Sequence, residues 1–187
     1  GAAALLKKNP PEGNVVLLFQ PAEESKGGAK PMIAQGALKG VDMIFGGHIE
    51  THHLAGEIGM KTGIHTAYAD LFEIRITGRG GHAARPHETV DAVLVSSLLV
   101  LEFQTIVSRN IDPVQPVVIT IGQITAGTVS NAIAETAVLK GTIRTTDESV
   151  RKQIIDKMKK IISAYASLHG AKISFILHPG YPPIINE

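Results

Sequence analysis

Hydrophobic positions divide the chain into two regions with different patterns. In the first region, two apolar runs, residues 15–19 and residues 41–45 with Asp42 inside the second, flank a short stretch with helical spacing at residues 29–38. A continuous apolar run predicts a buried strand, and a strand–helix–strand order predicts that the two strands are parallel neighbours. We therefore expect residues 14–48 to form a strand–helix–strand unit of an α/β sheet.

From about residue 67 the pattern changes to strict alternation. Residues 70–77 place apolar side chains on one face and polar side chains on the other, which is typical of an antiparallel strand with one face in water. Thr145 and Glu148 have the spacing of a capping box that opens a helix, and Gly170 is placed to end it. The expected elements after the first strand are a helix at about 89–108, strands at 117–124 and 137–145, the capped helix, and a strand at 173–177. This β-α-β-β-α-β order predicts a ferredoxin-like α+β domain.

The two patterns predict three parts of the chain. Residues 1–66 are expected to be a fragment of an α/β catalytic domain, residues 67–179 an inserted ferredoxin-like domain, and residues 180–187 a linker that returns to the first domain. Two strands and one helix cannot close a core, because both edges of a two-stranded sheet stay open. We therefore expect more of the α/β domain before residue 1 and after residue 187, and residues 1–8 to be the end of a helix.

Composition excludes several classes of protein. The chain has 187 residues, 44% of them hydrophobic, and a formal net charge of +1. This composition argues against disorder and against a surface dedicated to nucleic acid or to an anionic membrane. The absence of cysteine excludes disulfides and thiolate metal sites in this sequence. No apolar run reaches about 18 residues and no signal peptide is visible, so we expect no membrane helix and a cytoplasmic protein.

Charged and metal-binding residue types follow both apolar runs of the first region. Glu23 and Glu24 come just after residues 15–19, and His48 comes just after residues 41–45. Ligand sites of open α/β sheets lie beyond the carboxyl ends of the strands, and a carboxylate with an imidazole suits zinc or manganese. Neighbouring extended residues point opposite ways, so the two glutamates would have different roles. The alternative is an exposed acidic pair that opens the next helix.

A glycine-rich loop follows the first alternating strand. Gly78, Gly80 and Ala83 imitate the dinucleotide-binding fingerprint, but Pro86 separates them from the next helix. The better interpretation is that the glycines turn the backbone and direct His82 outward, where it is a catalytic group or an ordinary loop histidine. Three further histidines are expected to be exposed loop residues, because no strand end or helix face fixes them: His52, His53 and His65.

Four motifs together resemble a known family. They are Phe-Gln-Pro-Ala-Glu-Glu at 19–24, Gly-Arg-Gly-Gly-His-Ala-Ala-Arg-Pro-His at 78–87, Ser-Arg-Asn-Ile-Asp-Pro at 108–113 and Gly-Thr-Ile-Arg at 141–144. In this order they resemble the amidohydrolase branch of the aminoacylase and carboxypeptidase metallohydrolases, which includes N-acyl-amino-acid, hippurate and auxin-conjugate hydrolases. The resemblance implies a two-metal catalytic domain interrupted by a ferredoxin-like lid that dimerises.

The resemblance also implies roles for single residues. Glu23 matches the general base, and Glu24 and His48 match ligands of a pair of divalent ions, manganese or zinc. His82 matches a lid histidine that reaches the active site of the partner subunit and polarises the scissile carbonyl. It implies a homodimer that acts on a small N-acyl amino acid or related amide, with no nucleic-acid or membrane partner.

Two lid positions and one departure complete the comparison with the family pattern. Asn131 and Arg144 match positions near the substrate carboxylate, although the family more often has proline after Ile133. The upstream segment with histidine, aspartate and cysteine ligands is absent, as is the downstream histidine ligand. We therefore expect no useful catalysis from this segment alone, with a partial or empty metal site. The alternative is a non-catalytic dimerisation module of a larger protein; an RNA-binding sheet is disfavoured, since only 4% of residues are aromatic.

Overall fold

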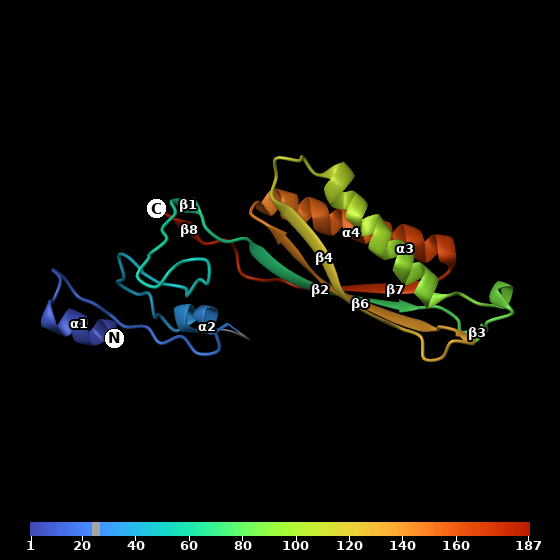
Figure 1. The fold of residues 1–187 in the computed structure, drawn as a ribbon, viewed down its shortest axis with the longest axis horizontal. Coiled ribbons are helices and arrows are strands. Elements are labelled where there is room, and N and C mark those ends of the chain that lie inside the picture. The colour runs from blue at the N-terminus through green and yellow to red at the C-terminus, as the bar shows by residue number, and fades with distance from the viewer. Residues whose placement is uncertain (24–26) are drawn as a thin grey trace. The chain divides into compact units, whose positions relative to one another are not determined.

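The computed structural model describes residues 1–23 and 27–187. The chain divides into two compact units, residues 1–57 and residues 58–187. Figure 1 shows both units, and the helices and strands carry its labels.

The first unit contains two short helices, α1 (Ala2–Lys8) and α2 (Ala29–Ala34). Lys7 and Lys8 occupy the last turn of α1, where positive side chains suit the negative end of the helix dipole. This helix agrees with the helical end expected at residues 1–8. Neither helix buries a residue, so neither forms the centre of a core.

The strands predicted in this unit are not formed, and the prediction of a parallel strand–helix–strand unit is wrong for the described residues. Residues 14–20 and 43–50 have no regular secondary structure. Phe19 is 84% exposed and Phe45 is 90% exposed. A strand exists only where a neighbour completes its hydrogen bonds, and neither run pairs with another described segment. The helix is also shorter than expected, because Gly36 takes a φ of 89° two residues beyond its end.

The second unit is built on a four-stranded sheet with two helices. Its main elements are β2 (Tyr68–Thr77), α3 (Ala92–Thr105), β4 (Val117–Ala126), β6 (Thr136–Thr145), α4 (Glu148–His169) and β7 (Lys172–His178). The strands lie in the order β4-β6-β2-β7, and every neighbouring pair is antiparallel. The β-α-β-β-α-β order along the chain is the one that the alternating pattern predicted. Figure 1 shows α3 and α4 together on one face of this sheet.

Two short ribbons extend this domain. Strand β3 (Gly81–His82) pairs with β5 (Ala132–Ile133), and β1 (Gly63–Ile64) pairs with β8 (Ile185–Asn186). A single 3-10 turn, η1 (Pro86–Glu88), follows β3. The loop of residues 78–82 and the terminal linker therefore each contain a paired segment that the sequence did not reveal.

The hydrophobic core lies between the sheet and the two helices. The inward positions of β2 are fully buried, as are Leu99 and Phe103 of α3 and Met158 of α4. No helix of this unit covers the opposite face of the sheet, and Leu71 on that face is half exposed. Burial of one face explains why the β2 sequence alternates with a period of two.

Aspartates cap the N-terminal ends of the two helices. The side chain of Asp91 accepts hydrogen bonds from the backbone N–H groups of the first turn of α3. Asp147 does the same for α4, so the predicted capping box of Thr145 and Glu148 is wrong. Oδ1 of Asp147 accepts hydrogen bonds from the N–H groups of Ser149 and Val150 at 2.7 and 2.9 Å, and it satisfies both. At the other end, Gly170 has a φ of 67°, which confirms the predicted left-handed helix stop.

Helix α3 continues into a π-helical turn, η2 (Ile106–Asn110). Together they form a helix of 19 residues with a mean hydropathy of 1.5, long and apolar enough by length and composition to cross a membrane. It is not an uninterrupted apolar run, because Ser96, Ser97 and Glu102 lie within it, and so it does not contradict the expectation from the sequence. Its inner side chains, among them Leu99, Phe103 and Ile106, pack in the core. That packing is typical of the central helix of a two-layer domain.

Candidate functional site

The predicted residues His82 and Asn131 lie next to each other on one ribbon. His82 is paired with Ala132, and the backbone N–H of Ala83 donates to the carbonyl of Asn131 at 3.3 Å. Directly opposed residues of an antiparallel ribbon share a face, whereas the next residue is turned to the other face. Ala132 therefore shares the face of His82, and Asn131 lies in the turn directly before β5.

The glycines of this loop are required by close approach of the backbone. A Cβ atom at Gly78 would lie 2.1 Å from the carbonyl oxygen of Val90, and one at Gly81 would lie 2.7 Å from Cγ2 of Thr89. Arg79 and Val90 exchange two backbone hydrogen bonds of 3.0 and 2.9 Å. The loop is therefore held on both sides, and it presents an exposed His82.

The hydrogen bond to the His82 ring fixes its tautomer. The backbone N–H of Ala84 donates to Nδ1 of His82 at 3.1 Å. A backbone N–H can only donate, so Nδ1 accepts, and the proton of the neutral ring lies on Nε2. The Nε2–H group can then donate a hydrogen bond to a substrate oxygen that becomes negative during reaction.

Arg144 lies at the other end of the sheet. It is exposed on β6, paired with Ala69 on one side and Val118 on the other. The loop that carries His82 begins only after Thr77, the last residue of β2. Thr77 lies eight residue steps beyond Ala69 along β2, which corresponds to roughly 26 Å at about 3.3 Å per step. One protomer therefore does not bring Arg144 and His82 together.

Gly141, the first residue of the motif that contains Arg144, also has a packing role. A Cβ atom there would lie 2.2 Å from the carbonyl oxygen of Thr120 and 2.4 Å from the ring of Phe72. Ile143 is buried in the core, and Arg144 faces outward. The motif is thus a strand segment with one constrained glycine, one core residue and one exposed cation.

The predicted metal and base residues belong to the first unit. Glu23 and His48 are exposed, and Glu24 lies outside the described residues. In the described part of the chain, no group of three or more histidine, aspartate or glutamate side chains could hold a metal ion. The donor types suit a divalent ion, but two ligands are fewer than the three or four protein ligands of a zinc site. We therefore derive no reaction step through a metal.

The remaining loop histidines have ordinary partners. Nδ1 of His52 lies 2.7 Å from Glu50 Oε1, and this contact holds the pKa of Glu50 below its ordinary value. His53 lies 3.8 Å from Glu57, and the backbone of His65 donates to the carbonyl of Ile184 at 2.8 Å. All three are exposed, as expected of loop residues.

A buried charged network was missed by the sequence analysis. Asp70 is completely buried and binds the guanidinium of Arg151, with Nε to Oδ2 at 2.6 Å and Nη2 to Oδ1 at 3.0 Å. The hydrogen bonds that Arg151 donates to this carboxylate are the largest cause that raises the pKa of Arg151 above its ordinary value. The signal was present, because Asp70 occupies the same inward alternation as Phe72 and Ile74.

Known proteins contain a domain similar to the one formed by the second unit. Residues 68–169 match the family model of a peptidase dimerisation domain. The chain is 40% identical over 189 residues to the N-acetyl-L-cysteine deacetylase of Bacillus subtilis, covering all of this chain and 45% of that protein. It is 41% identical over 193 residues to thermostable carboxypeptidase 1 of Saccharolobus solfataricus, covering all of this chain and 49% of that protein. The chain thus spans about half the length of the curated relatives it matches.

Solved structures give the same picture. A putative aminohydrolase from methicillin-resistant Staphylococcus aureus superposes with a TM-score of 0.81 at 30% identity, over 90% of this chain and 43% of that one. A Bacillus subtilis protein described as a dinuclear metal binding peptidase from the M20 family superposes with a TM-score of 0.74 at 30% identity, over 99% of this chain and 47% of that one. The family match covers more than half of the sequence, and so this chain belongs to the M20 peptidase family through its peptidase dimerisation domain.

Proposed function

We propose that this chain is the dimerising lid, with part of the catalytic domain, of a metal-dependent amidohydrolase that cleaves N-acyl amino acids or related small amides. The matched dimerisation domain is the observation that carries the proposal. Relatives named as a deacetylase and an N-acyl-L-amino acid amidohydrolase support the substrate class. The strand order β4-β6-β2-β7 with two helices on one face supports the ferredoxin-like description of the lid.

The dimer surface that we propose combines α3 with the open edge of the sheet. The outer stripe of α3, defined here as Val93, Leu94, Ser97 and Leu101, is exposed although it is largely apolar. Strand β4 is at the end of the sheet order, so one of its edges pairs with no other described strand. Exposed edges and apolar patches of this kind are natural sites of association. A second copy related by a two-fold axis would cover both with the same surface.

A dimer also resolves the separation of His82 from Arg144. Arg144 is paired near the start of β2 and His82 follows its end, and the strand between Ala69 and Thr77 spans roughly 26 Å at about 3.3 Å per residue. An active site that uses both must therefore take them from two protomers. We propose that His82 and the neighbouring Asn131 serve the site of the partner, while Arg144 serves the site of its own protomer.

The chemistry assigned to these residues follows from their types. Glu23 takes a proton from the attacking water and later gives it to the leaving amine. Nε2–H of His82 donates a hydrogen bond to the oxyanion of the tetrahedral intermediate, and Arg144 and Asn131 hold the substrate carboxylate. Glu24 and His48 would supply part of the ligand set for manganese or zinc. Such an ion, when bound, lowers the pKa of a coordinated water.

Mixing two inactive variants of the full-length protein tests the exchange of His82 between protomers. In a mixed dimer of His82→Ala and Arg144→Ala, one site keeps both wild-type residues and the other loses both. Random reassociation makes half of the dimers mixed, so about a quarter of the wild-type sites should be restored. If the mixture stays as inactive as the separate variants, His82 and Arg144 do not meet across a dimer.

The base role has a separate test. The Glu23→Gln variant of the full-length protein keeps the size of the side chain and removes the base, so kcat should fall by about 10²–10⁴. Activity within about tenfold of wild type would exclude Glu23 as the base.

A non-catalytic dimerisation module is the second candidate, because the described residues contain no group of three or more side chains that could hold a metal. For the 187-residue chain itself we expect no hydrolysis and no stoichiometric metal. Metal analysis and an assay with N-acetyl amino acids on this chain would contradict that expectation if both were positive. Metal-ligand segments in the parent gene would favour the enzyme over the module.

A further inference from the structure

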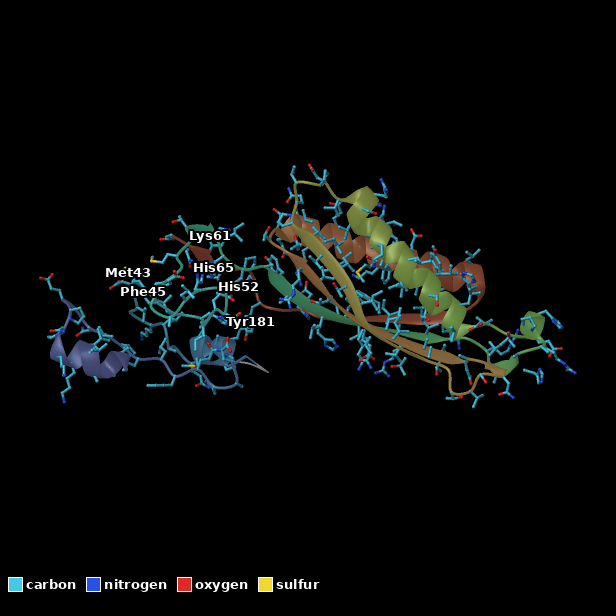
Figure 2. All side chains as sticks on the ribbon, in the orientation of Figure 1. Met43, Phe45, His52, Lys61, His65 and Tyr181 are labelled. Carbon is cyan, nitrogen blue, oxygen red and sulfur yellow. The ribbon has the colours of Figure 1, made fainter. Side chains whose placement is uncertain are left out.

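Two segments of the chain enter and leave the dimerisation domain side by side. Strands β1 and β8 pair through residues 63–64 and 185–186. The backbone N–H of Ile184 donates to Oγ1 of Thr66 at 2.8 Å, and the Asn186 amide donates to the carbonyl of Lys61 at 3.0 Å. Figure 2 labels Lys61, His65 and Tyr181 on these segments. The incoming and outgoing segments thus form one hydrogen-bonded two-stranded ribbon, which we call the β1–β8 ribbon.

The buried carboxylate of Asp70 holds the outgoing connection. Its Oδ1 atom accepts the backbone N–H of Gly180 at 2.8 Å, in addition to the two bonds from Arg151. Arg151 is itself fixed by Tyr68, whose ring centroid lies 5.0 Å from the guanidinium carbon. A buried charge is tolerated only when its hydrogen bonds are satisfied, and here three donors do so. The network joins the start of β2 and the first turn of α4 to the outgoing connector, residues 179–183.

The connector itself has few ways to bend. Residues 179–183 read Pro-Gly-Tyr-Pro-Pro, and each proline fixes its own φ near −65°. Gly180 is the single glycine in this stretch, and the Asp70 bond immobilises it. A Cβ atom at Gly180 would lie 2.3 Å from the carbonyl oxygen of Ala69, so its position also depends on close contact with β2. The one permissive residue is therefore held in place.

We propose that Asp70 locks residues 179–183 into a rigid strap, so that the four-stranded sheet and the β1–β8 ribbon move as one body. Reorientation of the dimerisation domain then occurs beyond the ribbon, or it requires the bond between Asp70 and Gly180 to break. This conformational role is independent of the proposed hydrolase activity, because it involves neither His82 nor the metal ligands.

Backbone NMR of the 187-residue chain tests the lock. In the wild type, the Gly180 amide should exchange slowly with solvent, and the ¹⁵N order parameters of Gly180 and Ile185 should equal the value of about 0.85 found for rigid backbone. In Gly180→Ala the new Cβ displaces the strap, and the order parameters at positions 180 and 185 should fall below about 0.6. Gly122→Ala is the control, because a Cβ at Gly122 meets no atom within 4 Å.

Two outcomes would overturn the proposal. The first is a wild-type chain in which the Gly180 amide exchanges as an unprotected amide or Ile185 is already mobile. The second is a Gly180→Ala variant whose order parameters stay at wild-type values. Asp70→Asn provides a variant that leaves the glycine unchanged and replaces one acceptor oxygen by an amide group, and it should lower the same order parameters.

Discussion

Replacing Leu94 and Leu101 with alanine should weaken the proposed dimer. These side chains lie seven residues apart on the outer stripe of α3, and in the single chain they are 51% and 67% exposed. Full burial of a leucine contributes about 1.5–3 kcal/mol, so burying these exposed fractions contributes about 2 kcal/mol in each protomer. A two-fold interface buries every residue twice, which gives about 4 kcal/mol for the dimer. Alanine keeps about a quarter of the apolar surface, leaving a loss of about 3 kcal/mol.

This loss corresponds to a dissociation constant about 100-fold higher, since about 1.4 kcal/mol is tenfold. Sedimentation equilibrium over a range of protein concentrations measures it directly. Leu168→Ala is the matched control, because Leu168 is 76% exposed but lies on α4. The reasoning fails if the double variant keeps a dissociation constant within about threefold of wild type, well below the expected change, or if the Leu168 control weakens the dimer equally.

Two further predictions concern stability. Arg151→Met leaves the Asp70 carboxylate buried without its partner and should lower the free energy of unfolding by about 3–5 kcal/mol, measured by urea titration. Lys152→Met removes only an exposed contact and should change it by less than about 1 kcal/mol; equal losses would refute the buried role of the pair. Hydrogen bonds, first from the Ser149 hydroxyl, hold the pKa of Asp147 below its ordinary value of 3.8. The stability that this carboxylate adds is therefore present above pH 3.8 and is lost as the pH falls through the lower folded pKa. The difference between wild type and Asp147→Ala should shrink from pH 7 to pH 2, and a difference that grows would contradict this sign.

The second unit could be predicted from the sequence because its strands have one buried face. Alternation in β2 follows directly from that arrangement. Gly170 predicts the end of α4, because glycine readily adopts the left-handed conformation that ends a helix. The first unit could not be predicted in the same way. An apolar run reports that side chains prefer burial, but it does not supply the strand that must pair with it. Residues 15–19 and 41–45 have the preference and, in the described chain, no partner strand.

Parts of the candidate site were hidden for a different reason. The pairing of His82 with Ala132 joins residues fifty positions apart, and no local pattern encodes it. The cap of α4 was misassigned because Thr145 and Asp147 both offer an oxygen near the helix start, and only geometry decides between them. Asp70 is a third case. A charged residue within an alternating apolar series indicates that a buried partner exists, but the sequence does not show that this partner is Arg151.

The position of β2 inside the sheet has a consequence for how the chain folds. This strand is the first of the four strands of this sheet along the chain, but both of its neighbours come much later, with Tyr68 paired to Thr145 and Thr77 paired to Lys172. Pairings between residues so far apart in the sequence require large loops to close, at a cost in entropy, before the strand contacts form. This requirement slows folding. During synthesis one edge of β2 therefore stays unpaired until β7 has left the ribosome.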